Sequence, residues 1–298
     1  MATTTSITTT YAGEFAGDYI AAALLSGVTL SGGGVTIKPN IKFKEVLKKL
    51  ALDSILKDAT CDFDSTSNVT LTERILQPEE FQVNLQLCKK DFRQDWEAAS
   101  MGFSQYDNLP RNFSDFLLAQ VAAKVAEKVE QNIWQGATAN AGEFDGFQTL
   151  LAADSDVVDV SGTTLSASNI IAEMNKVVDA IPGGVYGKED LKIYIPTSAA
   201  KFYVQAQAAL GYRDLYNVGK TDMNFQGIQL YTSPGLGNDK MVAAQSSNLF
   251  FGTGLLNDWQ EVKLIDMADI DGSQNVRVIL RGSAGVQHGI GSDIVLYS

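Results

Sequence analysis

The sequence is poor in the residues from which most catalytic and metal sites are built. It has one histidine, His288, and two cysteines, Cys61 and Cys88, in 298 residues. A histidine relay or a multi-histidine metal site therefore lacks partners, and we expect His288 to be structural. Two cysteines are too few for a disulfide scaffold and do not have the spacing of a zinc site, which favours a reduced pair in a cytosolic protein.

Positive charge is scarce as well. The chain has 23 Lys and Arg against 35 Asp and Glu, a formal net charge of -12. A protein that wraps nucleic acid needs clustered Lys and Arg, so this balance argues against that class, although an acidic chain can still enclose nucleic acid without gripping it. The longest apolar run near the start, residues 19–25, is far too short to span a membrane, and no signal-peptide pattern is present. We expect a soluble protein made in a cytoplasm.

Known catalytic motifs are missing too. Residues 282–285 do not fit a nucleophile elbow, and residues 252–254 lack the third glycine of a dinucleotide fingerprint. Three acids near the end, Asp266, Asp269 and Asp271, do not have the spacing of a calcium loop, so we expect a solvated turn. The sequence predicts no catalytic, cofactor-binding or metal site, which favours a structural or binding protein over an enzyme.

The rest of the chain is arranged around a long amphipathic helix predicted for residues 112–134. Asn112 can cap its start and Gly136 follows its end. At 1.5 Å per residue the helix would be about 35 Å long. Its apolar arc consists of Leu118, Val121, Ala122, Val125, Ala126, Val129 and Ile133, and its polar arc of Gln120, Lys124, Glu127, Lys128, Glu130 and Gln131.

Two regions before this helix have distinct compositions. Residues 1–37 are rich in Thr, Gly and Ala, have too little apolar surface for a core of their own, and are predicted to form an arm. The arm keeps Phe15, Tyr19 and Leu24, so we expect it to lie on its own body or on a neighbour; a frayed terminus is the alternative.

The second region, residues 43–57, has helical spacing and is predicted to be another amphipathic helix. Its lysines and those just ahead form the most basic patch of the chain. A solvated helix face explains this patch, and contact with an acidic neighbouring subunit or with nucleic acid is the alternative. The patch consists of Lys38, Lys42, Lys44, Lys48 and Lys49.

Residues 60–91 change to the alternating period of β-strands. Two strands meet near residues 76–79, which predicts a long β-hairpin with Cys61 and Cys88 near its base. A two-stranded ribbon cannot stabilise itself in water, so it must fold back on its own domain or be buried by another copy. The alternating apolar positions are Val69, Leu71 and Ile75 in the first strand and Phe81, Val83, Leu85 and Leu87 in the second.

Beyond the long helix, short strands alternate with helices, as in an α/β or α+β domain. Asp271-Gly272 between two alternating runs predicts a further hairpin, and residues 293–297 form a last strand. We expect strands near residues 157–160, 191–195, 228–231, 240–244 and 248–251, and helices near 168–180 and 197–210.

This order of elements resembles the major capsid proteins of tailed bacteriophages, whose fold is named after phage HK97. The most specific local similarities are residues 130–136 leading to 144–147, and the close at 276–278, 285–287 and 294–297. The resemblance implies an α+β fold. Its parts would be an N-terminal arm (1–37), a helix leading into the peripheral domain (38–59), an extended β-hairpin loop (60–91), a peripheral domain with a spine helix (92–144), an axial domain (145–255), a peripheral return hairpin (256–282) and a closing axial strand (283–298).

The resemblance also implies a function. The chain would form hexamers and pentamers of an icosahedral shell that encloses double-stranded DNA, assembled in the host bacterial cytoplasm and ending in the virion. Its partners would be a portal protein and separate scaffolding or decoration proteins, with no membrane. An encapsulin-type compartment housing a cargo enzyme and an ordinary α/β enzyme stay open as alternatives. The residues expected at contacts between subunits are Phe15, Tyr19, Leu24, Ile75, Phe81, Val83, Leu85 and Leu87.

Overall fold

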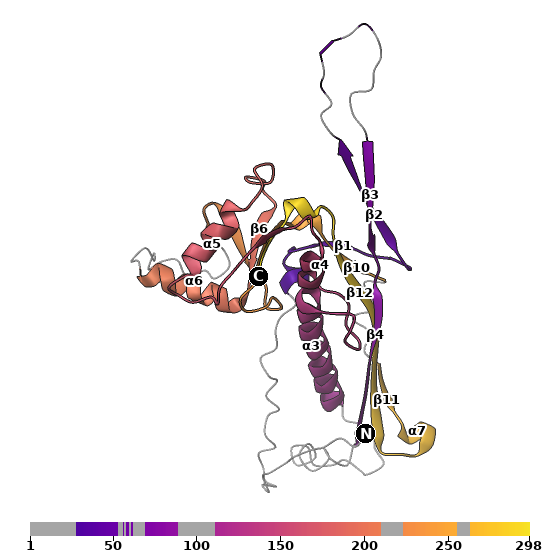
Figure 1. The fold of residues 1–298 in the computed structure, drawn as a ribbon. Coiled ribbons are helices and arrows are strands. Elements are labelled where there is room, and N and C mark those ends of the chain that lie inside the picture. Colours follow the sequence, from indigo (N-terminus) through magenta and orange to yellow (C-terminus); the bar gives the residue numbers. More distant parts are fainter. Residues whose placement is uncertain are drawn as a thin grey trace.

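The computed structural model describes residues 28–52, 56, 58–59, 61, 69–88, 111–209, 223–254 and 263–298. These residues form two mixed sheets with helices packed on them and a two-stranded ribbon that projects from the body (Figure 1). The expected α+β class is confirmed. Phe15, Tyr19 and Leu24, three of the residues expected to contact other subunits, lie outside the described residues.

The larger sheet, which we call the axial sheet, has the strand order β5-β13-β9-β6-β8-β7. Helices α5 (Ile170–Asp179) and α6 (Thr197–Ala209) supply apolar residues to one of its faces. The expected strands and helices of this region are confirmed to within about two residues. The strands are β5 (Val158–Val160), β6 (Leu191–Ile195), β7 (Asn224–Phe225), β8 (Ile228–Thr232), β9 (Met241–Gln245) and β13 (Val295–Tyr297).

The central strands of this sheet are buried on both faces. Successive side chains of a strand point to opposite sides, and both sides are covered here. Alternate residues enter two different cores. Ile193, Ile195, Met241, Ala243, Val295 and Tyr297 join the core formed with α5 and α6. Tyr194, Val242, Ala244 and Leu296 join the core formed with α3 (Arg111–Gln135) and α4 (Phe147–Ala153). The sheet therefore lies between two helical layers.

The smaller sheet has the order β1-β10-β12-β11, and β4 pairs with the long strand β12. The predicted tail hairpin is confirmed, since β11 and β12 pair antiparallel across a short helix, α7 (Ala268–Asp271). Gly272 adopts φ 71°, the left-handed conformation that ends this helix. The strands are β1 (Thr36–Lys38), β4 (Glu79–Cys88), β10 (Leu249–Thr253), β11 (Lys263–Asp266) and β12 (Asn275–His288).

The long helix is confirmed as α3, which begins one residue before the expected cap, so Asn112 lies inside it. Val129 and Ile133 are buried as expected. The assignment of Glu130 to the polar arc was wrong, because this carboxylate is almost completely buried. Helix α4 and the single-turn 3-10 helices η1 (Ser246–Asn248) and η3 (Gly291–Asp293) were not predicted.

The predicted helix at residues 43–57 is wrong. Residues Glu45–Leu52 form strand β2, which pairs antiparallel with β3 (Val69–Leu76). The segment EVLKKLAL has apolar residues at spacings that suit either structure, and short apolar runs cannot be assigned by periodicity alone. The pairing partner, β3, decides in favour of the strand.

The predicted hairpin between residues 69–76 and 81–88 is also wrong in its pairing, although both strands exist. Strand β3 pairs with β2, and β4 pairs with β12 over ten residues. The chain passes from β3 into β4 through Gln77 and Pro78 without reversing (Figure 1). Cys61 and Cys88 are consequently not brought together at a hairpin base, and both are free thiols.

Residues 28–37 of the predicted arm lie against the body. Helix α1 (Val28–Ser31) and β1 flank the glycine run, and β1 pairs parallel with β10. The Tyr231 hydroxyl donates to the Val28 carbonyl (2.6 Å), and the Tyr194 hydroxyl donates to the Gly34 carbonyl. A Cβ at Gly34 would lie 2.9 Å from the Tyr231 ring, so the glycines permit this close approach.

Candidate assembly surface

One face of the β2–β3 ribbon carries three apolar side chains that no described part of the chain covers fully, with the charged pair Lys48 and Glu73 between them. Val46 and Ile75 are directly opposite in the register, so their side chains share one face, and Leu71 lies on that face four residues before Ile75. Val46 is 44% exposed, Ile75 49% and Leu71 54%. The ribbon extends beyond the body (Figure 1). We call Val46, Leu71 and Ile75 the ribbon face.

The base of the ribbon is anchored firmly. Leu76 is fully buried, and a Cβ at Gly252 of β10 would lie 3.0 Å from its side chain. The Gln287 side-chain amide donates to the Ile75 carbonyl (3.1 Å). Arg74 forms an ion pair with Asp154, which follows α4. The ribbon is therefore fixed at one end, and its projecting part extends past the rest of the described residues.

The ion pair at this base extends to the single histidine. His288 Nε2 lies 2.8 Å from Asp154 Oδ2, and His288 is almost completely buried. Burial opposes ionisation of Asp154, but hydrogen bonds from His288, the Asp156 amide and Arg74 outweigh it and lower the pKa of Asp154 to about 2. Burial lowers the pKa of His288 from 6.5, although the Asp154 hydrogen bond opposes this. Neutral His288 therefore donates Nε2–H to ionised Asp154, a structural role that fits the sequence-based expectation.

Strand β4 carries four of the residues expected at contacts between subunits: Phe81, Val83, Leu85 and Leu87. The structure places them in the smaller sheet, opposite Gly282, Leu280, Val278 and Val276 of β12. Phe81, Val83 and Leu87 are half-buried there, and Leu85 is 42% exposed. Among these four, Leu85 offers the most surface to another molecule.

A buried hydrogen-bond network joins α1, where the described chain begins, to the long helix α3. Thr29 donates from its backbone N–H and its hydroxyl to the Glu130 carboxylate, and its Oγ1 accepts from Trp134 Nε1 (3.0 Å). Burial raises the pKa of Glu130, and the two hydrogen bonds from Thr29 oppose this rise. Trp134 lies one helical turn beyond Glu130 on the same face, a signal that Glu130 points inward.

The predicted contact residues within the described chain differ in how much of their surface is exposed. Ile75 lies on the exposed ribbon face, and Leu85 lies exposed on β4. Val46 and Leu71, which share this face with Ile75, were not among the predicted contact residues, Val46 because its segment was predicted to be a helix. The alternation of residues 69–75 was the signal that could have identified Leu71.

Other kinds of site find no support in the described residues. No group of three or more His, Cys, Asp or Glu side chains there is arranged to hold a metal ion. No helix in the described part of the chain has both the length and the apolar character of a membrane span.

The fold is that of phage capsid proteins. No protein-family model and no curated protein matches the sequence. Among solved structures, the chain is similar over 94% of its length to 93% of a chain in the capsid of a native GTA particle, with a TM-score of 0.63 and 10% identity.

Two phage structures give the same result. The capsid of Myoviridae phage XM1 matches 92% of this chain and 92% of its own with a TM-score of 0.60 and 13% identity. A structure of Mycobacterium phage Ogopogo matches 94% of both chains with a TM-score of 0.61 and 12% identity. At such low identity the similarity shows the fold, and it confirms the fold that the order of elements implied.

Proposed function

We propose that this chain is the major capsid protein of a tailed double-stranded DNA bacteriophage, a structural subunit without catalytic activity. The observation that carries the proposal is the ribbon face: three apolar side chains on an anchored, projecting ribbon, which the described chain does not cover fully. Exposed apolar strands are an aggregation hazard unless a partner buries them. In a chain whose fold is that of capsid subunits, the partner is another copy.

The assembly would be a closed shell of hexamers and pentamers. Contacts between unlike surfaces of identical copies form rings when the rotation closes, and rings of two sizes tile an icosahedral shell. Interfaces made by interlocking ribbons and arms belong to the obligate class, about 2,000 Å² or more. Phe15, Tyr19, Leu24, Ile75, Phe81, Val83, Leu85 and Leu87 would contribute to them, together with Val46 and Leu71.

The net charge and the fold support a proposal for what the shell encloses and which proteins the subunit contacts. With a net charge of -12, the subunit would enclose DNA without sequence-specific binding. A portal protein and separate scaffolding or decoration proteins would complete a particle assembled in the host bacterial cytoplasm and retained in the virion. The main alternative is an encapsulin-type compartment; the phage and GTA capsid structures described above favour the virion.

Electron microscopy of the purified protein tests the proposal. A capsid subunit forms rings or closed particles tens of nanometres across, whereas an ordinary α/β enzyme forms a small uniform oligomer. Nucleic acid extracted from particles isolated from infected or lysogenic cells identifies a phage shell, and a packaged enzyme identifies a cargo compartment. A monomer that stays monomeric at high concentration would overturn the proposal.

A further inference from the structure

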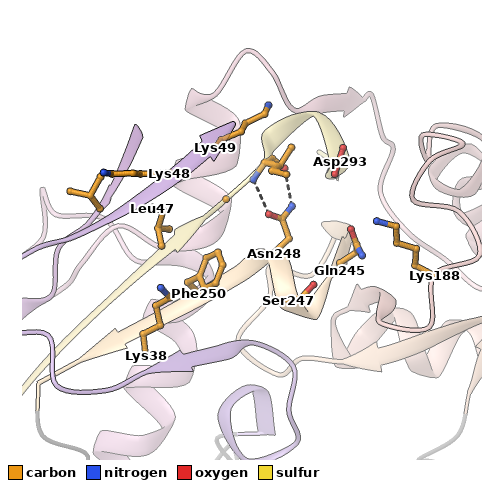
Figure 2. Close-up of a pocket in the computed structure, with 13 residues that line it drawn as sticks. Lys38, Leu47, Lys48, Lys49, Lys188, Gln245, Ser247, Asn248, Phe250 and Asp293 are labelled. Atoms are coloured by element: carbon orange, nitrogen blue, oxygen red, sulfur yellow. Dashed lines mark hydrogen bonds between the residues drawn. The ribbon is translucent and has the colours of Figure 1, made fainter. Parts of the chain in front are cut away.

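A basic groove of about 580 Å³ lies where the base of the ribbon meets the axial sheet. Apolar side chains from three segments line it: Val46 and Leu47 of β2, Phe250 of β10, and Ile290. Four lysines line it too, against one acid, Asp293. Figure 2 shows Lys38, Lys48 and Lys49 on the ribbon side and Lys188 facing them from the opposite side.

Two of the four lysines have acidic neighbours within the described chain, and two do not. Lys38 is paired with Glu45 and lies 5.1 Å from the centre of the Phe250 ring. Lys48 lies directly opposite Glu73 in the β2–β3 register, on the face that carries Val46 and Ile75. Lys49 points to the other face. Lys49 and Lys188 form no salt bridge with any described carboxylate. Lys49 and Lys188, on two sides of an apolar lining, favour an acidic and partly apolar occupant.

The chain itself presents a segment of this chemistry. The tip between β11 and β12 carries Ile270, which is 67% exposed, between the acids Asp266 and Asp271. Hydrogen bonds from Ser273 lower the pKa of Asp271, so this carboxylate is charged at neutral pH. Figure 1 shows α7 at the opposite end of the molecule from the ribbon. A molecule therefore cannot fill its own groove with its own tip.

We propose that the basic groove of one copy receives the β11–α7–β12 tip of a second copy. Ile270 would lie against Leu47, Phe250 and Ile290, and Asp266 and Asp271 would face Lys49 and Lys188. This proposal rests on the proposed function and specifies one of the contacts between shell subunits. The two surfaces differ, so the contact is heterologous and propagates from copy to copy. Its charges set register and specificity, because exposed ion pairs add little affinity alone.

Charge reversal on both sides tests the contact. The groove variant Lys49→Glu/Lys188→Glu and the tip variant Asp266→Lys/Asp271→Lys should each reduce the assembled fraction at least tenfold, measured by sedimentation. The combined four-site variant should recover assembly, because the opposed charges are restored. Lys201→Glu, an exposed lysine on α6, is the matched control and should assemble normally. Normal assembly of the groove variant, or no recovery in the combined variant, overturns the proposal.

A cross-link identifies the occupant. In a Cys61→Ser/Cys88→Ser background, Lys49→Cys and Ile270→Cys together should give a ladder of disulfide-linked multimers from particles, and either substitution alone should give at most dimers. If the native chain forms no particles, the proposed function fails; if particles form without the ladder, this contact alone fails. Intact particles of the groove variant that have lost bound nucleic acid would assign the lysines to nucleic acid instead and overturn the contact.

Discussion

The ribbon β2–β3 and the central strands β9 and β13 all carry apolar side chains, but these side chains are exposed on the ribbon and buried on the central strands. Val242 and Leu296 face one core while Ala243 and Val295 face the other, so these strands are buried on both faces. Val46 and Ile75 also lie on paired strands, yet about half of each side chain is exposed. The axial sheet is complete within one chain, and the ribbon face is not.

This difference indicates which contacts stabilise each region. Apolar burial stabilises the axial sheet in the isolated subunit, at about 25 cal/mol per Å² removed from water. The ribbon face can gain that stabilisation only when another molecule covers it. Substitutions in the two regions should therefore separate cleanly into those that unfold the subunit and those that prevent assembly.

The largest effect on subunit stability is expected from Trp134→Ala. Trp134 is fully buried between the long helix α3 and the axial sheet, with its ring 5.1 Å from Tyr194 and 5.5 Å from Phe147. Loss of this side chain leaves a large cavity and should cost about 3–5 kcal/mol in chemical denaturation. A cost below about 1 kcal/mol would show that the region is not a packed core.

A smaller loss is expected from Thr29→Val, which keeps the size of the side chain and removes its hydroxyl. Glu130 loses one of its two donors from Thr29, and Trp134 Nε1 loses its acceptor. Groups left unpaired in a buried site cost about 1–3 kcal/mol. Chemical denaturation measures the change, and Thr29→Ser, which keeps the hydroxyl, is the control. Equal stability of the valine and serine variants would contradict the buried network.

Acid should weaken the ribbon anchor. The pKa of Asp154 is about 2 in the folded chain against an ordinary 3.8, so its contribution is present above about pH 4 and is lost as the pH falls toward 2. His288, whose pKa is lowered from 6.5 by burial, acts in the same direction because the folded state disfavours its protonation. The stability advantage of the native chain over Asp154→Asn, measured by denaturation at a series of pH values, should shrink between pH 5 and pH 2. A constant difference would contradict the ion pair.

The smallest effect on the isolated subunit is expected at the ribbon face. Val46→Ser/Leu71→Ser/Ile75→Ser should change the unfolding free energy by no more than about 0.5 kcal/mol per site, because the side chains are already half-exposed. The same variant should fail to form particles in electron microscopy. Thr70→Ser/Thr72→Ser, on the opposite face of β3, should assemble normally. A triple variant that unfolds the subunit would show that the face is covered internally.

The sequence was most informative where structure depends on local pattern. Helix α3 and strand β6 were predicted within one residue, because a 3.6-residue period over 25 residues and a compact apolar run between turn residues are strong signals. The order of the elements was enough to suggest the fold. Of the residues on the proposed ribbon face, Ile75 was among those expected at contacts between subunits, and Val46 was placed on a helix.

The failures share one physical cause, which is pairing between distant segments. Strand β4 pairs with β12, about 190 residues further along the chain, and no local pattern specifies that choice. The segment of β2 suits a helix or a strand until β3 is placed beside it. Glu130 is buried because Thr29, some 100 residues earlier in the chain, supplies its donors.

Thiol labelling at position 71 is the measurement that addresses the ribbon most directly. Leu71→Cys is placed in a Cys61→Ser/Cys88→Ser background, with Thr72→Cys as the matched position on the other face. Both thiols should react rapidly in dissociated subunits, and assembly should slow labelling at position 71 at least tenfold, and more than at position 72. Equal labelling rates at position 71 in free subunits and in particles, or protection already present in the free subunit, would contradict the claim that other copies cover the ribbon.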